Sequence, residues 1–299
     1  MILPSHDRFD YSALPKRPQY SWPGGKRLAM YVALNVETFG FGMEVGPVLG
    51  NPMPMPDHRN WSWREYGNRV GFWRLLELFD DLKLPAAHLA NSYLYDTHPD
   101  VMDAIRKRGD EFVGHGRTNS EKPGARPEED ERALIEEATS AIAKREGRPP
   151  RGWMTPLMMP SKVTLDLLKE AGYRYVLDWP CDDQPYWIRT RSGPLLNIPY
   201  PIETNDFTTV LTLHHDPLQF VGTVVRQFDE MVEQSERQPL VFAIALHAMI
   251  FGQPHRLRAL RDGLRRILQH PKFDRVWLAR PGDIASHCES LAAGIVPGS

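Results

Sequence analysis

The chain has 299 residues and a formal net charge of −2, so its charges are nearly balanced. Without a basic excess or a run of Lys and Arg, nucleic-acid binding is not expected. Its apolar runs are too short to cross a bilayer, and its N-terminus lacks the apolar core of a signal peptide. Two cysteines do not make a disulfide framework, so we expect free thiols and a cytoplasmic protein.

Strand-like and helix-like segments alternate along the chain. Short apolar runs predict buried strands, and apolar residues at helical spacing predict helices. In chain order we expect strand 28–37, helix 65–83, strand 86–91, helix 98–109, strand 111–114, helix 127–147, strand 152–155, helix 161–172, strands 173–178 and 194–199, helix 216–236, strand 240–247, helix 256–270, strand 275–278 and helix 281–291. Such alternation is typical of a parallel sheet and, at this length, predicts a closed or nearly closed (β/α) barrel.

Polar side chains recur at the C-terminal ends of the expected strands, where such barrels carry their chemistry. Asn35 and Glu37 end the first strand, His115 follows the third, and His247 ends the strand of residues 240–247. Taken alone, a terminal Glu is often a solvated surface residue, and a lone His is more often structural than catalytic. Their shared position at one end of the barrel favours a common active site.

Several stretches together resemble the polysaccharide deacetylases with a NodB-homology domain, and among them the allantoinase-like and cyclic-imide hydrolases. These stretches are WPGGKRLAMYVALNVE, REYGNRVGFWRLLELFDDL, EFVGHGRTNSE, PRGWMTP, DDQPYW, PYPIETND, ALHAMIFGQPHR and DRVWLARPGDIASH. The resemblance spans about residues 20–287 and implies a distorted, seven-stranded (β/α) barrel. We therefore expect residues 1–299 to form a single catalytic domain of this type, with an N-terminal arm over about residues 1–25 and long Pro-rich loops.

The resemblance also implies a reworked metal site. Metal-dependent members use two acidic residues after the first strand and an H-x-x-x-H pair. Here Asn35 takes the place of the catalytic base, Glu37 that of the metal-binding acid, His115 that of the first His, and Asn119 that of the second. A neutral amide is a poor zinc ligand, and metal-assisted hydrolysis needs three protein ligands and an open position. We expect no bound metal; if a divalent metal such as zinc is present, the resemblance implies Glu37, His115 and Asn119 as ligands.

Chemistry without a metal can still be assigned to the remaining residues. Hydrolysis of an amide needs an activated water, a stabilised oxyanion and an acid for the leaving nitrogen. We expect Glu37 to be the general base, with a pKa raised by an apolar barrel mouth. The late His of the family matches His247, so His247 or His115 would protonate the nitrogen or stabilise the oxyanion.

Further residues are candidates for binding the substrate. The amides of Asn35 and Asn119 suit the edge of an imide or ureide ring, and Trp153 and Trp179 would stack on its face. Arg256 stands near the start of an expected helix, a place that suits an anion. The alternative is that both Asn residues only brace the catalytic groups and that Arg256 only braces its loop.

These features favour a hydrolase of non-peptide C–N bonds that acts on a small-molecule amide, such as a cyclic amide, an imide or a ureide like allantoin. We also expect a homo-oligomer, dimer or tetramer. One alternative is a metal-dependent N-deacetylase of an N-acetylated sugar or related acyl amide, which the altered H-x-x-x-H pair disfavours. Another is an inactive barrel acting as a ligand-binding module, which the retained Glu37, His115 and His247 disfavour.

Overall fold

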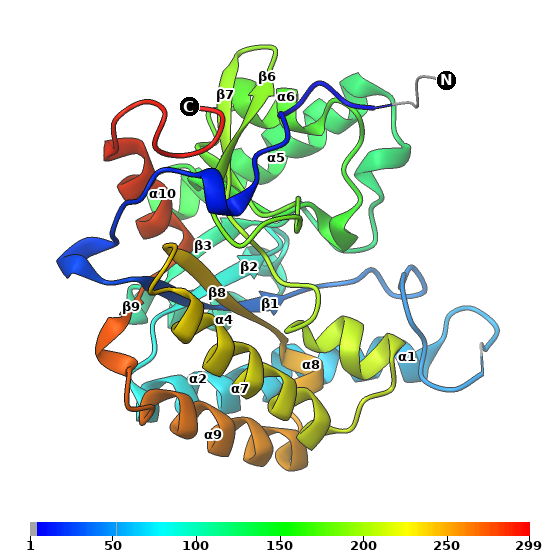
Figure 1. Cartoon of the computed structure of the whole chain (residues 1–299). Helices are drawn as coiled ribbons and strands as arrows, with labels where there is room; N and C mark the ends of the chain where they lie inside the picture. Colours follow the sequence, from blue (N-terminus) through cyan, green and yellow to red (C-terminus); the bar gives the residue numbers. More distant parts are fainter. Residues whose placement is uncertain (1–4, 52) are drawn as a thin grey trace.

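The computed structural model describes residues 5–51 and 53–299, in which nine strands form one curled sheet surrounded by helices (Figure 1). The strands are β1 (Leu28–Val36), β2 (Ala86–Ala90), β3 (Glu111–Gly114), β4 (Gly152–Trp153), β5 (Tyr175–Val176), β6 (Tyr186–Thr190), β7 (Gly193–Asn197), β8 (Leu240–His247) and β9 (Val276–Leu278). They are ordered β6-β7-β5-β4-β3-β2-β1-β8, with β9 beside the start of β1. All pairs are parallel except the β6–β7 hairpin, which confirms the expected α/β fold of the barrel type. In the described residues the sheet has nine strands instead of the expected seven, and it is curled but open between β6 and β8.

The helices cover the sheet on two sides. They are α1 (His58–Tyr66), α2 (Phe72–Leu82), α3 (Leu94–Thr97), α4 (Pro99–Arg108), α5 (Glu128–Glu146), α6 (Thr164–Glu170), α7 (Pro217–Gln234), α8 (Ala248–Phe251), α9 (Pro254–Leu268) and α10 (Pro281–Ser290). In Figure 1, α2, α7 and α9 lie below the sheet, whereas α5 and α6 lie above it. Within the described ranges, no helix has both the length and the apolar character of a membrane span.

Several elements differ from the sequence-based expectation, among them the unexpected short helices α3 and α8. The single helix expected over residues 65–83 is preceded by α1 and interrupted by a π-helical turn at Gly67–Gly71. Asp57 caps α1 by accepting a hydrogen bond from the Asn60 backbone N–H. The sequence pattern missed α1 because its buried residues are polar rather than apolar. The antiparallel strand β6 was not expected either, because it forms a local hairpin outside the strand–helix alternation.

The two faces of β1 belong to different apolar clusters. Leu28, Met30, Val32, Leu34 and Val36 pack with α2, α7 and α9, whereas Ala29, Tyr31 and Ala33 pack inside the barrel. Side chains alternate along a strand. The same alternation continues to the strand end, so Asn35 and Glu37 fall on the inner side.

Strand β8 repeats this arrangement beside β1. Its even-numbered residues join the outer cluster, and Val241, Ala243 and Ala245 join the inner one, so His247 is directed inward. Asn35 and His247 are paired in the parallel register of the two strands. The strand pairing therefore fixes His247 next to the end of β1.

One edge of β8 pairs with β1. The other edge is hydrogen-bonded to irregular backbone and not to a further strand. Val241 donates its backbone N–H to the carbonyl oxygen of Asp183, and Ala245 donates to that of Thr204. Asn205 forms an isolated parallel bridge with Ala245. These bonds bring the segment 204–206 against the inner end of β8, where it can reach His247.

A close backbone approach holds the segment after His247 in place. A Cβ on Gly71 would overlap the carbonyl oxygen of Ala248, and this backbone atom cannot rotate away. We expect Gly71→Ala to lower the free energy of unfolding by more than the ~1–3 kcal/mol typical of overpacking. Urea denaturation followed by circular dichroism measures this change.

The matched control is Gly222→Ala in α7. Its new Cβ would meet only the flexible Arg226 side chain, with Nη1 at 3.1 Å. Alanine is favoured over glycine inside a helix by up to about 1 kcal/mol, so this variant should be as stable as the parent or slightly more stable. Equal losses in both variants would contradict the close approach at Gly71.

Candidate active site

A cavity of about 440 Å³ lies where β1, β3 and β8 end, and it brings together four of the expected site residues. The polar side chains that line it near the strand ends are Asn35, Glu37, His115, Tyr200, Asn205 and His247. Apolar side chains form much of the remaining wall: Val45, Met154, Leu157, Met158, Met159 and Phe207. The carboxylate and both imidazoles therefore share one pocket with a largely apolar surround.

Glu37 lies between the two imidazoles. Its Oε1 is 3.4 Å from Nε2 of His115 and 3.7 Å from Nε2 of His247. Burial favours the neutral acid, but the charges of His247 and His115 outweigh burial and lower the pKa of Glu37. The expectation of a raised pKa was therefore wrong, because the sequence indicates burial but not the two partners. Glu37 is held as a carboxylate.

His247 is held by Asp206, a residue that the sequence analysis did not single out. Nδ1 of His247 donates to Oδ1 of Asp206 at 2.7 Å, and its backbone N–H donates to Oδ2 at 2.8 Å. Burial opposes protonation of the ring, but the charges of Asp206 and Glu37 outweigh it and raise the pKa of His247. The ring therefore carries a proton on Nδ1 and directs Nε2 toward Glu37.

His115 is oriented by the protein backbone instead of by a carboxylate. Its Nδ1 donates to the carbonyl oxygen of Met154 at 2.7 Å, since a carbonyl can only accept. This bond turns Nε2 toward Glu37. The two imidazoles thus reach the same carboxylate oxygen, but His247 is hydrogen-bonded on its other side to a buried carboxylate, whereas His115 is hydrogen-bonded there to a backbone carbonyl oxygen.

Asn119 lies in a buried network whose direction is fixed. Asn91 accepts a hydrogen bond from the Thr38 backbone N–H through Oδ1, so its Nδ2 donates to the His115 carbonyl oxygen and to Oδ1 of Asn119. The amide oxygen of Asn119 is therefore occupied. Its buried Nδ2 has no partner among the described residues. An amide nitrogen that carries two protons does not bind a cation.

The donor set does not fit the metal site that the family resemblance implied. Asn119 directs its oxygen at Asn91, which leaves only Glu37 and His115 of the three implied ligands. In residues 5–51 and 53–299, no group of three His, Cys, Asp or Glu side chains is arranged to hold a metal ion. The Asn at the position of the second His thus belongs to a hydrogen-bond network and does not serve as a metal ligand.

Three other expected binding residues lie outside the cavity lining. Trp153 is buried against Tyr173 and donates its indole N–H to Thr155, and Trp179 packs edge-on against Phe9 of the N-terminal arm. Arg256 donates to the Ile250 carbonyl oxygen from behind the site. The negative charge that acts on the Arg256 guanidinium is that of Asp206, a residue of the protein itself and not a substrate group. The position of these residues near strand ends in the sequence does not indicate whether their side chains face the cavity.

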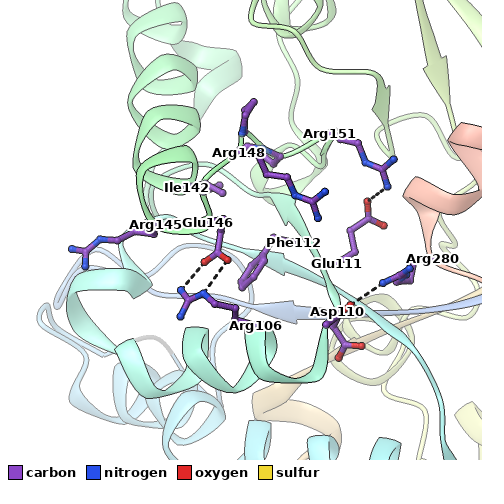
Figure 2. Close-up of a pocket in the computed structure, with 13 residues that line it drawn as sticks. Arg106, Asp110, Glu111, Phe112, Ile142, Arg145, Glu146, Arg148, Arg151 and Arg280 are labelled. Carbon is purple, nitrogen blue, oxygen red and sulfur yellow. Dashed lines mark hydrogen bonds and ion pairs between the residues drawn. The ribbon is translucent and has the colours of Figure 1, made fainter.

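A second cavity, of about 460 Å³, lies at the opposite ends of the strands, beside the start of β3 (Figure 2). Arginines dominate its lining, and carboxylates pair with four of the five, Arg148 being the exception among the described ion pairs. Arg106 pairs with Glu146, and Arg151 lies 3.7 Å from Glu111. It contains no His or nucleophile among its lining residues, so the chemistry is placed in the cavity around Glu37.

Comparison with known proteins shows the family of the chain. A family model described as polysaccharide deacetylase matches residues 65–176. The solved structure of PuuE allantoinase is 30% identical, with a TM-score of 0.80 and coverage of 97% of this chain and 98% of that one. A probable polysaccharide deacetylase from Pseudomonas aeruginosa PAO1 is also 30% identical, with a TM-score of 0.76, covering 89% and 92% of the two chains. The chain belongs to the polysaccharide deacetylase family.

A further member of the polysaccharide deacetylase family is the putative polysaccharide deacetylase of Schizosaccharomyces pombe. It is 29% identical over 280 residues, which is 88% of this chain and 85% of that one. As a family member, the protein is a hydrolase of C–N bonds other than peptide bonds. The family and the enzyme class expected from the sequence are confirmed.

Restoring the second His tests the reworked metal site. Asn119→His replaces an amide whose available atom is a hydrogen-bond donor with an imidazole that can bind metal next to Glu37 and His115. We expect the variant to retain more zinc or cobalt after dialysis than the parent, measured by elemental analysis. Asn119→Gln, which keeps the amide, is the control and should match the parent.

Two outcomes would contradict this account. A parent protein that keeps one metal ion per chain through dialysis would show that the fixed amide does not exclude a cation. Equal metal content in Asn119→His and Asn119→Gln would show that position 119 does not face the Glu37–His115 pair.

Proposed function

We propose that the protein hydrolyses a small cyclic amide, imide or ureide without a metal ion. The observation that carries this proposal is the buried Glu37 carboxylate between two imidazoles, in a cavity whose volume suits a small ring. The similarity to PuuE allantoinase over almost the whole of both chains supports a ring substrate. The unpartnered amide nitrogen of Asn119 supports chemistry without a cation.

The first step is attack of water on the ring carbonyl. Glu37 takes one proton of the water, a new C–O bond forms, and the carbonyl π electrons move to oxygen as an oxyanion. Tyr200 lines the cavity, and its hydroxyl accepts a hydrogen bond from Nδ2 of Asn35 at 3.0 Å, so its own proton is available for the oxyanion. Burial raises the pKa of Tyr200 above its usual value and keeps that proton on the hydroxyl.

The second step breaks the ring C–N bond. Oxyanion electrons return to carbon, and the leaving nitrogen takes a proton from Nε2 of His247, whose pKa is raised by Asp206 and Glu37 against the effect of burial. The products are a carboxylic acid and a free amine or amide in one opened chain. Transfer of a proton from Glu37 to His247, 3.7 Å apart, restores the starting state. His115 then serves as a positioning residue for Glu37.

Asn35 contributes to the site through its oxygen. Its Nδ2 donates to Tyr200 and to the Leu246 carbonyl oxygen, which fixes the direction of the amide. We propose that Oδ1 accepts from a ring N–H of the substrate, because no described residue donates to it. Asn35, which stands where metal-dependent members of the family have the catalytic base, would thus bind the substrate instead.

A substrate panel tests the proposed function. Release of acid from hydantoin, allantoin, succinimide and N-acetylglucosamine oligomers is followed at constant pH, with and without EDTA or added zinc. We expect turnover of at least one ring and no effect of EDTA. Turnover of the N-acetylated sugars alone, or loss of activity with EDTA that zinc restores, would instead support the metal-dependent deacetylase.

Removing the proposed base gives a quantitative prediction. Glu37→Gln keeps the shape of the side chain but cannot take a proton, so kcat should fall by roughly a hundredfold or more. Steady-state kinetics on the best ring substrate measures the change. Glu65→Gln is the matched control, because Glu65 pairs with His98 at 3.0 Å outside the cavity, and it should leave kcat unaltered. Similar kcat values for Glu37→Gln and the parent would remove Glu37 from the mechanism.

A further inference from the structure

The loop after β4 contributes an apolar wall that the hydrolytic steps do not use. Met154, Leu157, Met158 and Met159 all line the cavity. None of these side chains can act as an acid, a base or an oxyanion donor. Their presence in one wall therefore needs an explanation beyond bond cleavage.

Two of these residues have a backbone conformation that L-amino acids rarely adopt. Leu157 has φ 60° and Met158 has φ 52°, one after the other and neither of them glycine. Left-handed geometry is disfavoured for bulky residues because Cβ crowds the carbonyl oxygen. Such strain persists where the surrounding structure fixes it, and it is concentrated at binding sites.

Contacts around the loop fix this conformation. Asp178 accepts hydrogen bonds from the Thr155 backbone N–H and hydroxyl, both at 2.7 Å. The Met158 backbone N–H donates back to the Thr155 carbonyl oxygen at 2.9 Å. The loop is thus anchored on its buried side, and the side chains of Leu157 and Met158 contribute to the cavity wall.

The β1–α1 loop adds a second apolar contribution. Val45 lines the cavity, and the Arg64 guanidinium donates to its carbonyl oxygen at 2.9 Å. Phe207 lines the cavity as well, and its ring lies 5.2 Å from that of His247, centroid to centroid. The apolar wall therefore extends toward the catalytic His.

A polar substituent would find few partners on this wall. Burying an amide or a carboxylate against Met and Leu costs free energy, because its hydrogen bonds to water are not replaced. Methionine side chains are flexible and polarisable, so they adapt to apolar groups of several shapes. Outside the wall, the exposed Lys122 favours an acidic substituent, and Thr208 and Thr212 add hydroxyl groups to the lining.

From these observations we infer that the substrate is a cyclic amide that bears an apolar alkyl or aryl substituent, bound by the wall of Val45, Met154, Leu157, Met158, Met159 and Phe207. The inference rests on the proposed hydrolysis of a ring amide and adds the class of substituent. It places the ureide allantoin among the poor substrates, although a structurally similar protein is an allantoinase.

Four hydantoins that differ only at carbon 5 test the inference: unsubstituted, isobutyl, carboxymethyl and ureido, the last being allantoin. We expect kcat/KM for the isobutyl compound to exceed that for the ureido and carboxymethyl compounds by roughly tenfold or more. Equal or higher values for the ureido compound, or for the carboxymethyl compound through Lys122, would overturn the inference and leave ring hydrolysis intact. No turnover of any ring, unsubstituted hydantoin included, would overturn the proposed function and this inference with it.

Variants of the wall connect the preference to these residues. Met158→Gln places a polar group of similar length in the wall, so the isobutyl-to-ureido ratio of kcat/KM should fall by roughly tenfold. Met43→Gln is the matched control, because Met43 is 58% exposed and does not line the cavity. The same ratio in Met158→Gln and in the parent would overturn the role of the wall.

Leu157→Asn separates binding from stability. Asn tolerates the left-handed conformation better than Leu, so the melting temperature should not fall even though the wall loses an apolar group. We expect the isobutyl preference to decrease while the melting temperature is kept or raised. A lower melting temperature with the preference retained would show that Leu157 has a structural role only, and would overturn its place in the binding wall.

Discussion

The arrangement of the site depends on one buried negative charge. A carboxylate removed from water is unstable unless it is paired, and Glu37 is paired with two imidazoles. Each imidazole needs a further hydrogen-bond acceptor to fix its orientation. His115 has the Met154 carbonyl oxygen, and His247 has Asp206. Stabilising the charge on Glu37 therefore requires groups from three separate strands and two loops to meet at one place.

The fold meets this requirement through strand pairing and not through sequence proximity. Alternation along β1 and β8 directs Asn35, Glu37 and His247 inward, and the register places Asn35 beside His247. Irregular backbone on β8 then brings Asp206 to the ring of His247. In this setting a divalent cation would add positive charge beside a carboxylate that is already paired with His247, whose pKa is raised by Asp206 and Glu37 against the effect of burial. The fixed Asn119 amide directs a donor, not a ligand, at its surroundings.

Sequence pattern predicted the barrel and the positions of Glu37, His115 and His247 because strand ends in a parallel sheet converge on one side. Asp206 could not be predicted in this way, since it lies in an irregular loop 41 residues before His247 and only the tertiary fold joins them. The lowered pKa of Glu37 was missed for a related reason: a sequence indicates burial more readily than the distance to a partner. Trp153 and Trp179 do not line the cavity, and periodicity could not show this, because Trp153 lies in a two-residue strand and Trp179 follows another.

The protonation state of His247 tests the central claim most directly, because both the buried charge and the acid step depend on it. Titration of the ring nitrogens by 15N NMR, with the signal assigned from its loss in His247→Gln, measures the pKa without any substrate. Charges of Asp206 and Glu37 should hold that pKa above the ordinary value of about 6.5, so the ring loses its proton only as the pH rises through the raised value. Asp206→Asn should lower the pKa. A His247 pKa at or below the ordinary value, unaffected by Asp206→Asn, would contradict the account.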